Sequence, residues 1–213
     1  MTNPDLTHLY FLLDRSGSMQ SIREDTVGGF DAFIAEQREQ PGECRVTLAQ
    51  FDDQYELVYA DRPIREVPGL VLQPRGTTAL LDAIGRLVTD AGAGLAALPE
   101  AERPGTVIVG IMTDGHENAS KEWTHPAIKE LIQQQTQAYA WEFLYMGADQ
   151  DAIEVGTALG VPAARSVTYS RASAGVAMAS TSAMVGRLRA ARASGVSTAD
   201  IGYSDEEREA SAH

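Results

Sequence analysis

The sequence predicts an α/β fold in which a doubly wound, mostly parallel central sheet carries helices on both faces and has one antiparallel edge strand. Short apolar runs that suit buried strands alternate along the chain with longer amphipathic segments that suit helices. One early pair of strand-like runs breaks this alternation, because only a tight polar turn separates them, and such a pair predicts a hairpin. A hairpin requires one strand to run antiparallel to its neighbour.

The first predicted strand, residues 8–14, is a nearly continuous apolar run that ends in Asp14. Such a run is typical of a strand that is buried on both faces of a parallel sheet. Ser-Gly-Ser at residues 16–18 indicates a loop, and residues 21–39 carry apolar side chains at helical spacing. Strand, loop and helix in this order form the first unit of the predicted sandwich.

The hairpin and three later strands continue the pattern. Residues 43–51 and 55–59 are strand-like and flank the polar turn at 52–54. Further strands are predicted over residues 106–113, 141–146 and 165–169, and helices over residues 79–98, 124–138, 151–159 and 171–193. Folds of this type bind ligands at the carboxyl ends of the strands, where the strand order reverses. Asp14 and Asp114 both lie at such predicted strand ends.

The length and the cysteine content indicate one ordinary globular domain. The 213 residues are enough for a full hydrophobic core, and we expect a domain over residues 1–194 and a flexible C-terminal tail over residues 195–213. Cys44 is the single cysteine, so no disulfide forms within the chain, and we expect it to be a small core residue. The N-terminal residues lack a basic start followed by an apolar run, so a cytoplasmic location is expected.

The formal net charge of −13 bears on the class of partner. A surface of this sign repels phosphate backbones and anionic lipid, so we expect neither nucleic acid nor a membrane as a partner. No stretch reaches the roughly 20 consecutive apolar residues that span a bilayer. The composition favours no particular oligomeric state.

The segment that follows the first strand carries the chemistry. Asp14, Ser16 and Ser18 offer a carboxylate and two hydroxyls at alternating positions, and Gly17 allows the backbone between them to turn tightly. Mg2+ prefers oxygen ligands and retains several waters, so one carboxylate and two hydroxyls supply part of its coordination shell. The alternative is that these side chains only cap the following helix.

The sequence Asp-Arg-Ser-Gly-Ser-Met at residues 14–19 resembles the metal-ion-dependent adhesion site of von Willebrand factor A domains. The two other parts of that site are also present. A Gly-rich loop before a helix contains Thr78, which fits the family pattern better than Thr77, and Asp114 ends a buried strand. The resemblance covers roughly residues 8–170 and is closest to small stand-alone bacterial or phage-type domains.

The resemblance implies a Rossmann-like fold and a metal site made of Asp14, Ser16, Ser18, Thr78 and Asp114. The two serines would bind the ion directly, and Thr78 would bind it directly or through water. The two aspartates would act through waters or orient the hydroxyls. Mg2+ is the expected ion, and Mn2+ and Ca2+ also accept oxygen ligands. An open coordination position would receive an Asp or Glu carboxylate from a protein partner.

These features favour a non-enzymatic, Mg2+-dependent protein-binding module. The first alternative is a metal-dependent hydrolase or phosphoryl-transfer enzyme that uses Asp14. The haloacid dehalogenase-like pattern, however, needs a second aspartate two residues later, where this chain has Ser16. A nucleotide-binding domain is a weaker alternative, because neither Gly-rich phosphate-binding motif is present. A retained fold with a weakly occupied metal site is a further alternative.

Several other residues receive weaker predictions. His116 and Glu117 follow Asp114 and belong either to the rim of the site or to an ordinary polar loop. Arg15 is expected to point outward, where it could meet an acidic partner. Asp149 and Asp151 follow another predicted strand end; we expect a plain turn there, and the alternative is that they line the rim of the site. Core positions are expected for Trp123, Trp141 and Tyr145.

Overall fold

Six strands form a single sheet in the order β3-β2-β1-β4-β5-β6. The computed structural model describes residues 2–149 and 151–213. The strands are β1 (Asn3–Asp14), β2 (Glu43–Phe51), β3 (Tyr55–Pro63), β4 (Pro104–Thr113), β5 (Glu142–Ala148) and β6 (Ser166–Tyr169). All neighbouring pairs are parallel except β2 and β3, so β3 is the antiparallel edge strand that the hairpin predicted. The strand order reverses between β1 and β4.

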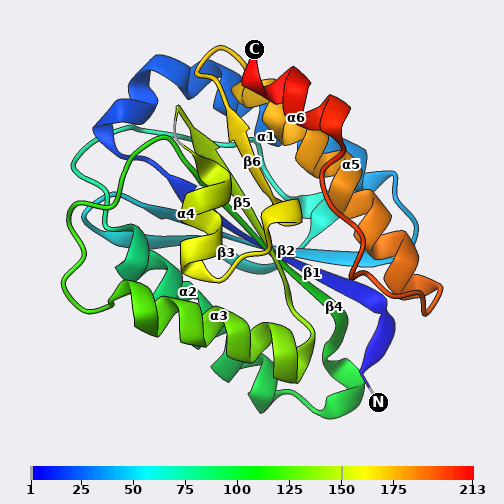
Figure 1. The fold of residues 1–213 in the computed structure, drawn as a ribbon. Helices are drawn as coiled ribbons and strands as arrows, with labels where there is room; N and C mark the ends of the chain where they lie inside the picture. The colour runs from blue at the N-terminus through cyan, green and yellow to red at the C-terminus, as the bar shows by residue number, and fades with distance from the viewer. Residues whose placement is uncertain (1, 150) are drawn as a thin grey trace.

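Helices cover both faces of this sheet (Figure 1). One face carries α1, α5 and α6, and the other carries α2, α3 and α4. The helices are α1 (Arg23–Arg38), α2 (Leu80–Ala97), α3 (His125–Tyr139), α4 (Ala152–Leu159), α5 (Ala174–Ala193) and α6 (Asp205–Ala212). Short 3-10 helices occur at η1 (Gly17–Ile22), η2 (Ile64–Glu66), η3 (Glu100–Glu102) and η4 (Ala163–Arg165).

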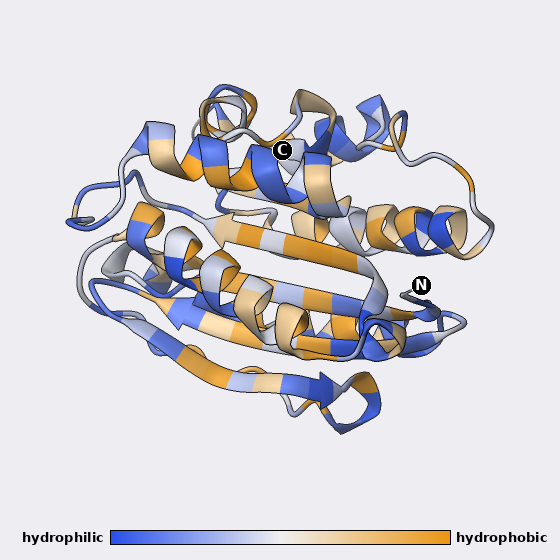
Figure 2. Ribbon diagram, turned by 90° about the horizontal axis from the view of Figure 1, so that it is seen from below, coloured by the Kyte–Doolittle hydropathy of each residue, from blue (hydrophilic) through white to orange (hydrophobic). Residues whose placement is uncertain are grey.

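The two-residue period of β1 explains why there are two cores. Leu9, Phe11 and Leu13 point to the face of α1 and α5, whereas Tyr10 and Leu12 point to the face of α2. Both sets are buried, as the continuous apolar run predicted. Figure 2 shows the same division, with largely hydrophobic central strands between helices that alternate between hydrophobic and hydrophilic residues. No helix among the described residues has the length and apolar character needed to span a bilayer.

The predicted elements all form, and the differences lie at their ends. β1 begins at Asn3 rather than residue 8, and β3 continues to Pro63 rather than ending at residue 59. The added residues of both strands include polar side chains and proline, so they extend the strands without a continuous apolar run in the sequence. The buried thiol of Cys44 lies in the core, as expected.

The C-terminal segment differs from the expected flexible tail over residues 195–213. It ends in α6, which packs against α5 and β6. The buried Tyr203 anchors it, with its hydroxyl 2.8 Å from the hydroxyl of Thr181. Ser204 and Glu207 form a capping box at the start of α6, and Arg187 pairs with Glu207. The charged run at residues 205–209 is typical of a solvated tail, which is why the sequence predicted one. The sequence alone does not show that Tyr203, just before this run, is buried.

Candidate metal centre

The carboxylate of Asp14 is fixed at the carboxyl end of β1. The residue is fully buried, and its Oδ1 accepts a hydrogen bond from the backbone N–H of Ser16 at 2.6 Å. Its Oδ2 accepts a hydrogen bond from the hydroxyl of Thr113, the last residue of β4, at 2.5 Å. The donors therefore come from the loop after β1 and from the end of β4, the two strands between which the strand order reverses.

The two serines curl round the same point. The hydroxyls of Ser16 and Ser18 lie 3.0 Å apart, and Ser18 donates to Oδ1 of Asp114 at 2.6 Å. Gly17 donates its backbone N–H to the carbonyl of Gly76 at 3.2 Å, which holds this loop against the Gly-rich loop before α2. The segments after β1 and β4 are thus joined through Ser18.

Thr78 is brought to the same place, whereas Thr77 is exposed. A Cβ atom added at Gly115 would lie 2.9 Å from the Thr78 hydroxyl and 3.6 Å from the Ser18 hydroxyl, so the three segments converge there. The backbone of Thr78 exchanges two hydrogen bonds with Asn118, each of 3.0 Å. Within the described ranges, no residue forms a hydrogen bond with the Thr78 hydroxyl, which leaves its lone pairs available.

The electrostatics of the site favour a cation. Burial raises the pKa of Asp14 to about 6, and the hydrogen bonds from Thr113 and Ser16 do not offset this effect. Burial also raises the pKa of Asp114. The buried Oδ2 of Asp114 accepts no hydrogen bond of good geometry from any described residue, and its charged neighbour is Arg171, whose Nη1 lies 3.0 Å away. Two buried carboxylates, of which only Asp114 pairs with this guanidinium, leave negative charge uncompensated.

Arg171, in the loop after β6, is a part of the site that the sequence analysis missed. Besides Asp114, its guanidinium contacts Oδ2 of Asp149 at 2.7 Å, the carbonyl of Ser18 at 3.2 Å and the hydroxyl of Ser21 at 3.0 Å. It therefore lies across the rim of the candidate centre. No motif marks an arginine so far along the chain from Asp14 and Asp114, because only the fold brings the loops together.

The donor set fits a hard divalent cation. All five predicted residues contribute oxygens: two carboxylates, Asp14 and Asp114, and the hydroxyls of Ser16, Ser18 and Thr78. Hard cations such as Mg2+ prefer such ligands. In the part of the chain that the structure describes, no group of three or more His, Cys, Asp or Glu side chains is arranged to hold a metal, so any ion bound at this centre would depend on hydroxyls.

Arg15 does not point outward, and that prediction was wrong. The residue is buried, its Nε lies 3.0 Å from Oδ2 of Asp52, and its Nη1 pairs with Glu56. Arg75 contacts the same oxygen of Asp52 at 2.7 Å. The charge of Arg15 is thus balanced by the hairpin. Asp52 also joins the loop after β1 to the Gly-rich loop before α2, and these contacts link segments that are far apart in the sequence.

The other rim candidates have structural roles or remain on the surface. Glu117 accepts hydrogen bonds from the backbone of Leu81, Ala119 and Ser120, which join the loop after β4 to the start of α2. Burial raises its pKa, but these hydrogen bonds outweigh burial and the net pKa is lowered. His116 is exposed.

The turn and core predictions agree with the structure. Asp151 caps α4 through the backbone N–H groups of Ile153 and Glu154. Asp149 follows β5, and its carboxylate lies 2.7 Å from Arg171, so it also reaches the rim of the candidate centre. Trp141 and Tyr145 are buried in the core beneath α2 and α3, and the partly buried Trp123 packs against the same core.

Solved structures with this fold include von Willebrand factor A domains. The von Willebrand factor domain of a type V pilus tip protein from Porphyromonas gingivalis matches with a TM-score of 0.58 and 11% identity, over 85% of this chain and 95% of that chain. Proximal thread matrix protein 1 from the mussel byssus gives 0.59 and 13%, over 86% and 46%. A von Willebrand factor type A protein from Catenulispora acidiphila gives 0.52 and 15%, over 84% and 42%.

The similarity is one of fold. No family model matches the chain, and no curated protein matches it. The chain spans about half the length of the mussel protein. At 11–15% identity these structures establish the arrangement of strands and helices, and the chemistry has to be argued from the side chains of this chain.

Proposed function

Because the chain has the fold of von Willebrand factor A domains, we propose that it is a non-enzymatic protein-binding module that depends on a divalent metal ion. The ion is Mg2+, with Mn2+ and Ca2+ as further ions that the oxygen donors suit. The ligands are Asp14, Ser16, Ser18, Thr78 and Asp114. The observation that carries the proposal is the buried pair of carboxylates, whose charge a single guanidinium does not balance.

The side chains divide into ligands and orienting groups. The hydroxyls of Ser16, Ser18 and Thr78 are the ligands nearest the ion. Asp14 holds the backbone of Ser16, and Asp114 accepts from Ser18, so each carboxylate orients a loop that carries a hydroxyl. When bound, the ion supplies a Lewis acid with an open position for a partner's Asp or Glu carboxylate. The partner's acidic group also meets Arg171 at the rim.

The geometry disfavours the alternative in which Asp14 is a nucleophile. Asp14 is fully buried, and both of its oxygens accept hydrogen bonds from Ser16 and Thr113. A nucleophile needs an accessible oxygen and a neighbouring acid or base. Two of the structural neighbours are named as a pilus tip protein and a thread matrix protein, which agrees with a non-enzymatic role.

Water proton relaxation with Mn2+ tests both parts of the proposal. Titration of the metal-free protein with Mn2+ should enhance relaxation, because the bound ion retains exchangeable waters. Acetate should then reduce the enhancement as its carboxylate replaces water. Asp14→Ala should abolish the enhancement, and Asp151→Ala, which removes an exposed carboxylate at the N-cap of α4, should preserve it. Enhancement that acetate does not change would contradict partner recruitment, and equal enhancement in Asp14→Ala would contradict the assigned site.

A further inference from the structure

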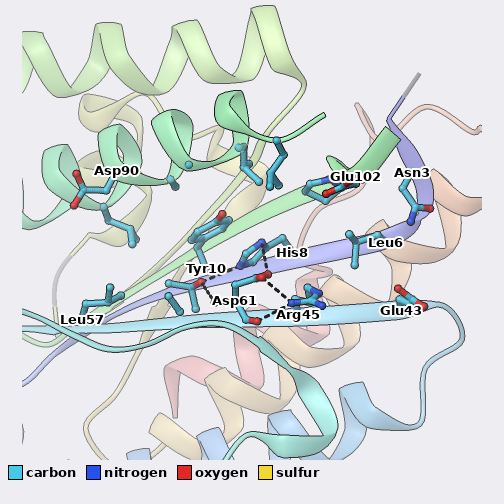
Figure 3. A pocket seen from close by; sticks show the side chains of 18 of the residues that line it. Asn3, Leu6, His8, Tyr10, Glu43, Arg45, Leu57, Asp61, Asp90 and Glu102 are labelled. Carbon is cyan, nitrogen blue, oxygen red and sulfur yellow. Dashed lines mark hydrogen bonds and ion pairs between the residues drawn. The ribbon is translucent and has the colours of Figure 1, made fainter. Parts of the chain in front are cut away.

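A cavity of about 540 Å³ lies at the opposite end of β1 from the candidate metal centre. Residues of the first half of β1 line it, whereas Asp14 is the last residue of that strand. The other walls come from β2, β3 and the second half of α2 (Figure 3). Its volume falls within the range of about 300–1,000 Å³ typical of small-molecule sites.

One side of the cavity is apolar and partly open to solvent. It is lined by Leu87, Ala91 and Leu95 of α2, of which Leu87 and Ala91 are buried, and by Leu57 of β3. Leu57 is 52% exposed, and Leu98, at the end of α2, is 36% exposed. Burying these side chains under a ligand of matching shape would gain about 25 cal/mol for each Å² of apolar surface removed from water.

The floor carries a tyrosine hydroxyl that opens onto the cavity. Tyr10 is 5% exposed, and its hydroxyl points from β1 into the cavity toward α2 (Figure 3). No described residue forms a hydrogen bond with this hydroxyl, so its donor and acceptor positions are open to water or to a ligand in the cavity. The ring stacks on His8, with 4.0 Å between the ring centroids, so its position is fixed.

His8 is held as a neutral group. Its Nε2 lies 2.9 Å from the hydroxyl of Thr47, and its Nδ1 lies 3.9 Å from Oδ1 of Asp61. Burial, and then the nearby charge of Arg45, lower the pKa of His8 to about 3. The imidazole therefore adds no positive charge to the floor at neutral pH.

The rim of the cavity is acidic. Among the described residues that line it, Arg45 is the one cationic side chain, and it is paired with the carboxylate of Asp61 at 2.7 Å. Asp90 lies 3.7 Å from Arg86. Glu43 and Glu102, both exposed, form no ion pair with any residue in the described ranges, so the end of the cavity near Asn3 carries net negative charge.

We propose that this cavity binds a small organic cation, namely a protonated amine attached to an apolar chain or ring. The ammonium group donates a hydrogen bond to the Tyr10 hydroxyl, and the apolar part lies along Leu57, Leu95 and Leu98. Glu43 pairs with Leu6 in the sheet, four residues from Tyr10, so Glu43 and Glu102 attract the cation through the negative charge at that end of the cavity and not by contact. A carboxylate or phosphate ligand would meet uncompensated negative charge at the same rim. The proposal rests on the cavity alone and is independent of the metal centre.

Calorimetric titration with 2-phenylethylamine tests the proposal, with 3-phenylpropionate as the anionic match and 2-phenylethanol as the neutral match. The amine should bind saturably at millimolar concentration or below, and more tightly than either match. Tyr10→Phe keeps the ring and should weaken amine binding about tenfold, the effect of one hydrogen bond to a charged group. The double variant Glu43→Gln, Glu102→Gln should weaken it severalfold and reduce its dependence on salt.

Glu154→Gln is the control, because it removes one exposed carboxylate from α4 at the other edge of the sheet; it should bind the amine as the unmodified chain does. Thermal melts verify that each variant is folded. Absence of amine binding, equal or tighter binding of the phenylpropionate, or unchanged binding in a folded Tyr10→Phe variant would overturn the proposal.

Discussion

Replacing Asp14 by asparagine should stabilise the metal-free protein above pH 6. Burial raises the pKa of this carboxyl from 3.8 in the unfolded chain to about 6 in the folded chain. The folded state therefore binds the proton more tightly. The stability that this provides is complete below about pH 4 and is lost as the pH rises through 6. A shift of about two pKa units corresponds to about 3 kcal/mol.

Asparagine resembles the protonated acid in size and charge. Its carbonyl can still accept from the Ser16 N–H, and its amide can donate to the Thr113 hydroxyl, which also lies 3.1 Å from the carbonyl of Gly115. The variant therefore avoids the buried charge without losing its partners. A gain of 2–3 kcal/mol should raise the melting temperature by roughly 4–12 °C for a chain of this size.

The assay is thermal unfolding in EDTA at pH 5 and pH 8, repeated with millimolar Mg2+. The advantage of Asp14→Asn should be complete at pH 8 and about half as large at pH 5, because the carboxyl of the unfolded chain is already ionised at pH 5. Mg2+ should raise the melting temperature of the unmodified chain alone, since only a folded state with its ligands intact binds the ion. Asp151→Asn, which retains an N-cap on α4, should show no such pH trend. A variant that is less stable than the unmodified chain at pH 8 would refute the reasoning.

Three other perturbations test separate parts of the structure. Arg171→Ala should tighten Mg2+ binding about fivefold in calorimetry, because its partly exposed ion pairs contribute roughly 1 kcal/mol in the metal-free state. Weaker binding would contradict competition between the guanidinium and the ion for Asp114. Gly85→Ala should destabilise the chain by about 1–3 kcal/mol in urea, because its Cβ would lie 2.2 Å from Trp123; an unchanged midpoint would contradict this packing. Tyr203→Ala should cost about 3–5 kcal/mol, and a much smaller loss would indicate that the C-terminal segment does not stabilise the domain.

The sequence predicted the features that depend on local pattern. The apolar run that ends in Asp14 and the one that precedes Asp114 indicated two parallel strands, and the structure places their ends beside each other. The Gly-rich loop indicated Thr78, which the structure brings next to Ser18 through Gly115. In each case the sequence pattern and the element that it predicts lie within one short segment. The parallel order of the strands then brings the ends of these segments together at one edge of the sheet.

The features that the sequence did not predict depend on contacts between distant segments. Arg15 is buried because the hairpin turn places Asp52 beside it, and Arg171 reaches Asp114 only after β6 is added to the sheet. The acidic cavity requires β3 to turn at Asp61, whose φ of +48° is uncommon for a residue with a side chain. None of these contacts has a periodicity that a single sequence displays.

The most direct test of the central claim is calorimetric titration of the metal-stripped chain with Mg2+, alongside Asp14→Ala. The proposed centre predicts saturable binding of one ion per chain in the unmodified protein and loss of that binding in the variant, with both proteins folded. Absence of binding in the unmodified protein, or equal binding in the two proteins, would contradict a metal centre built on Asp14.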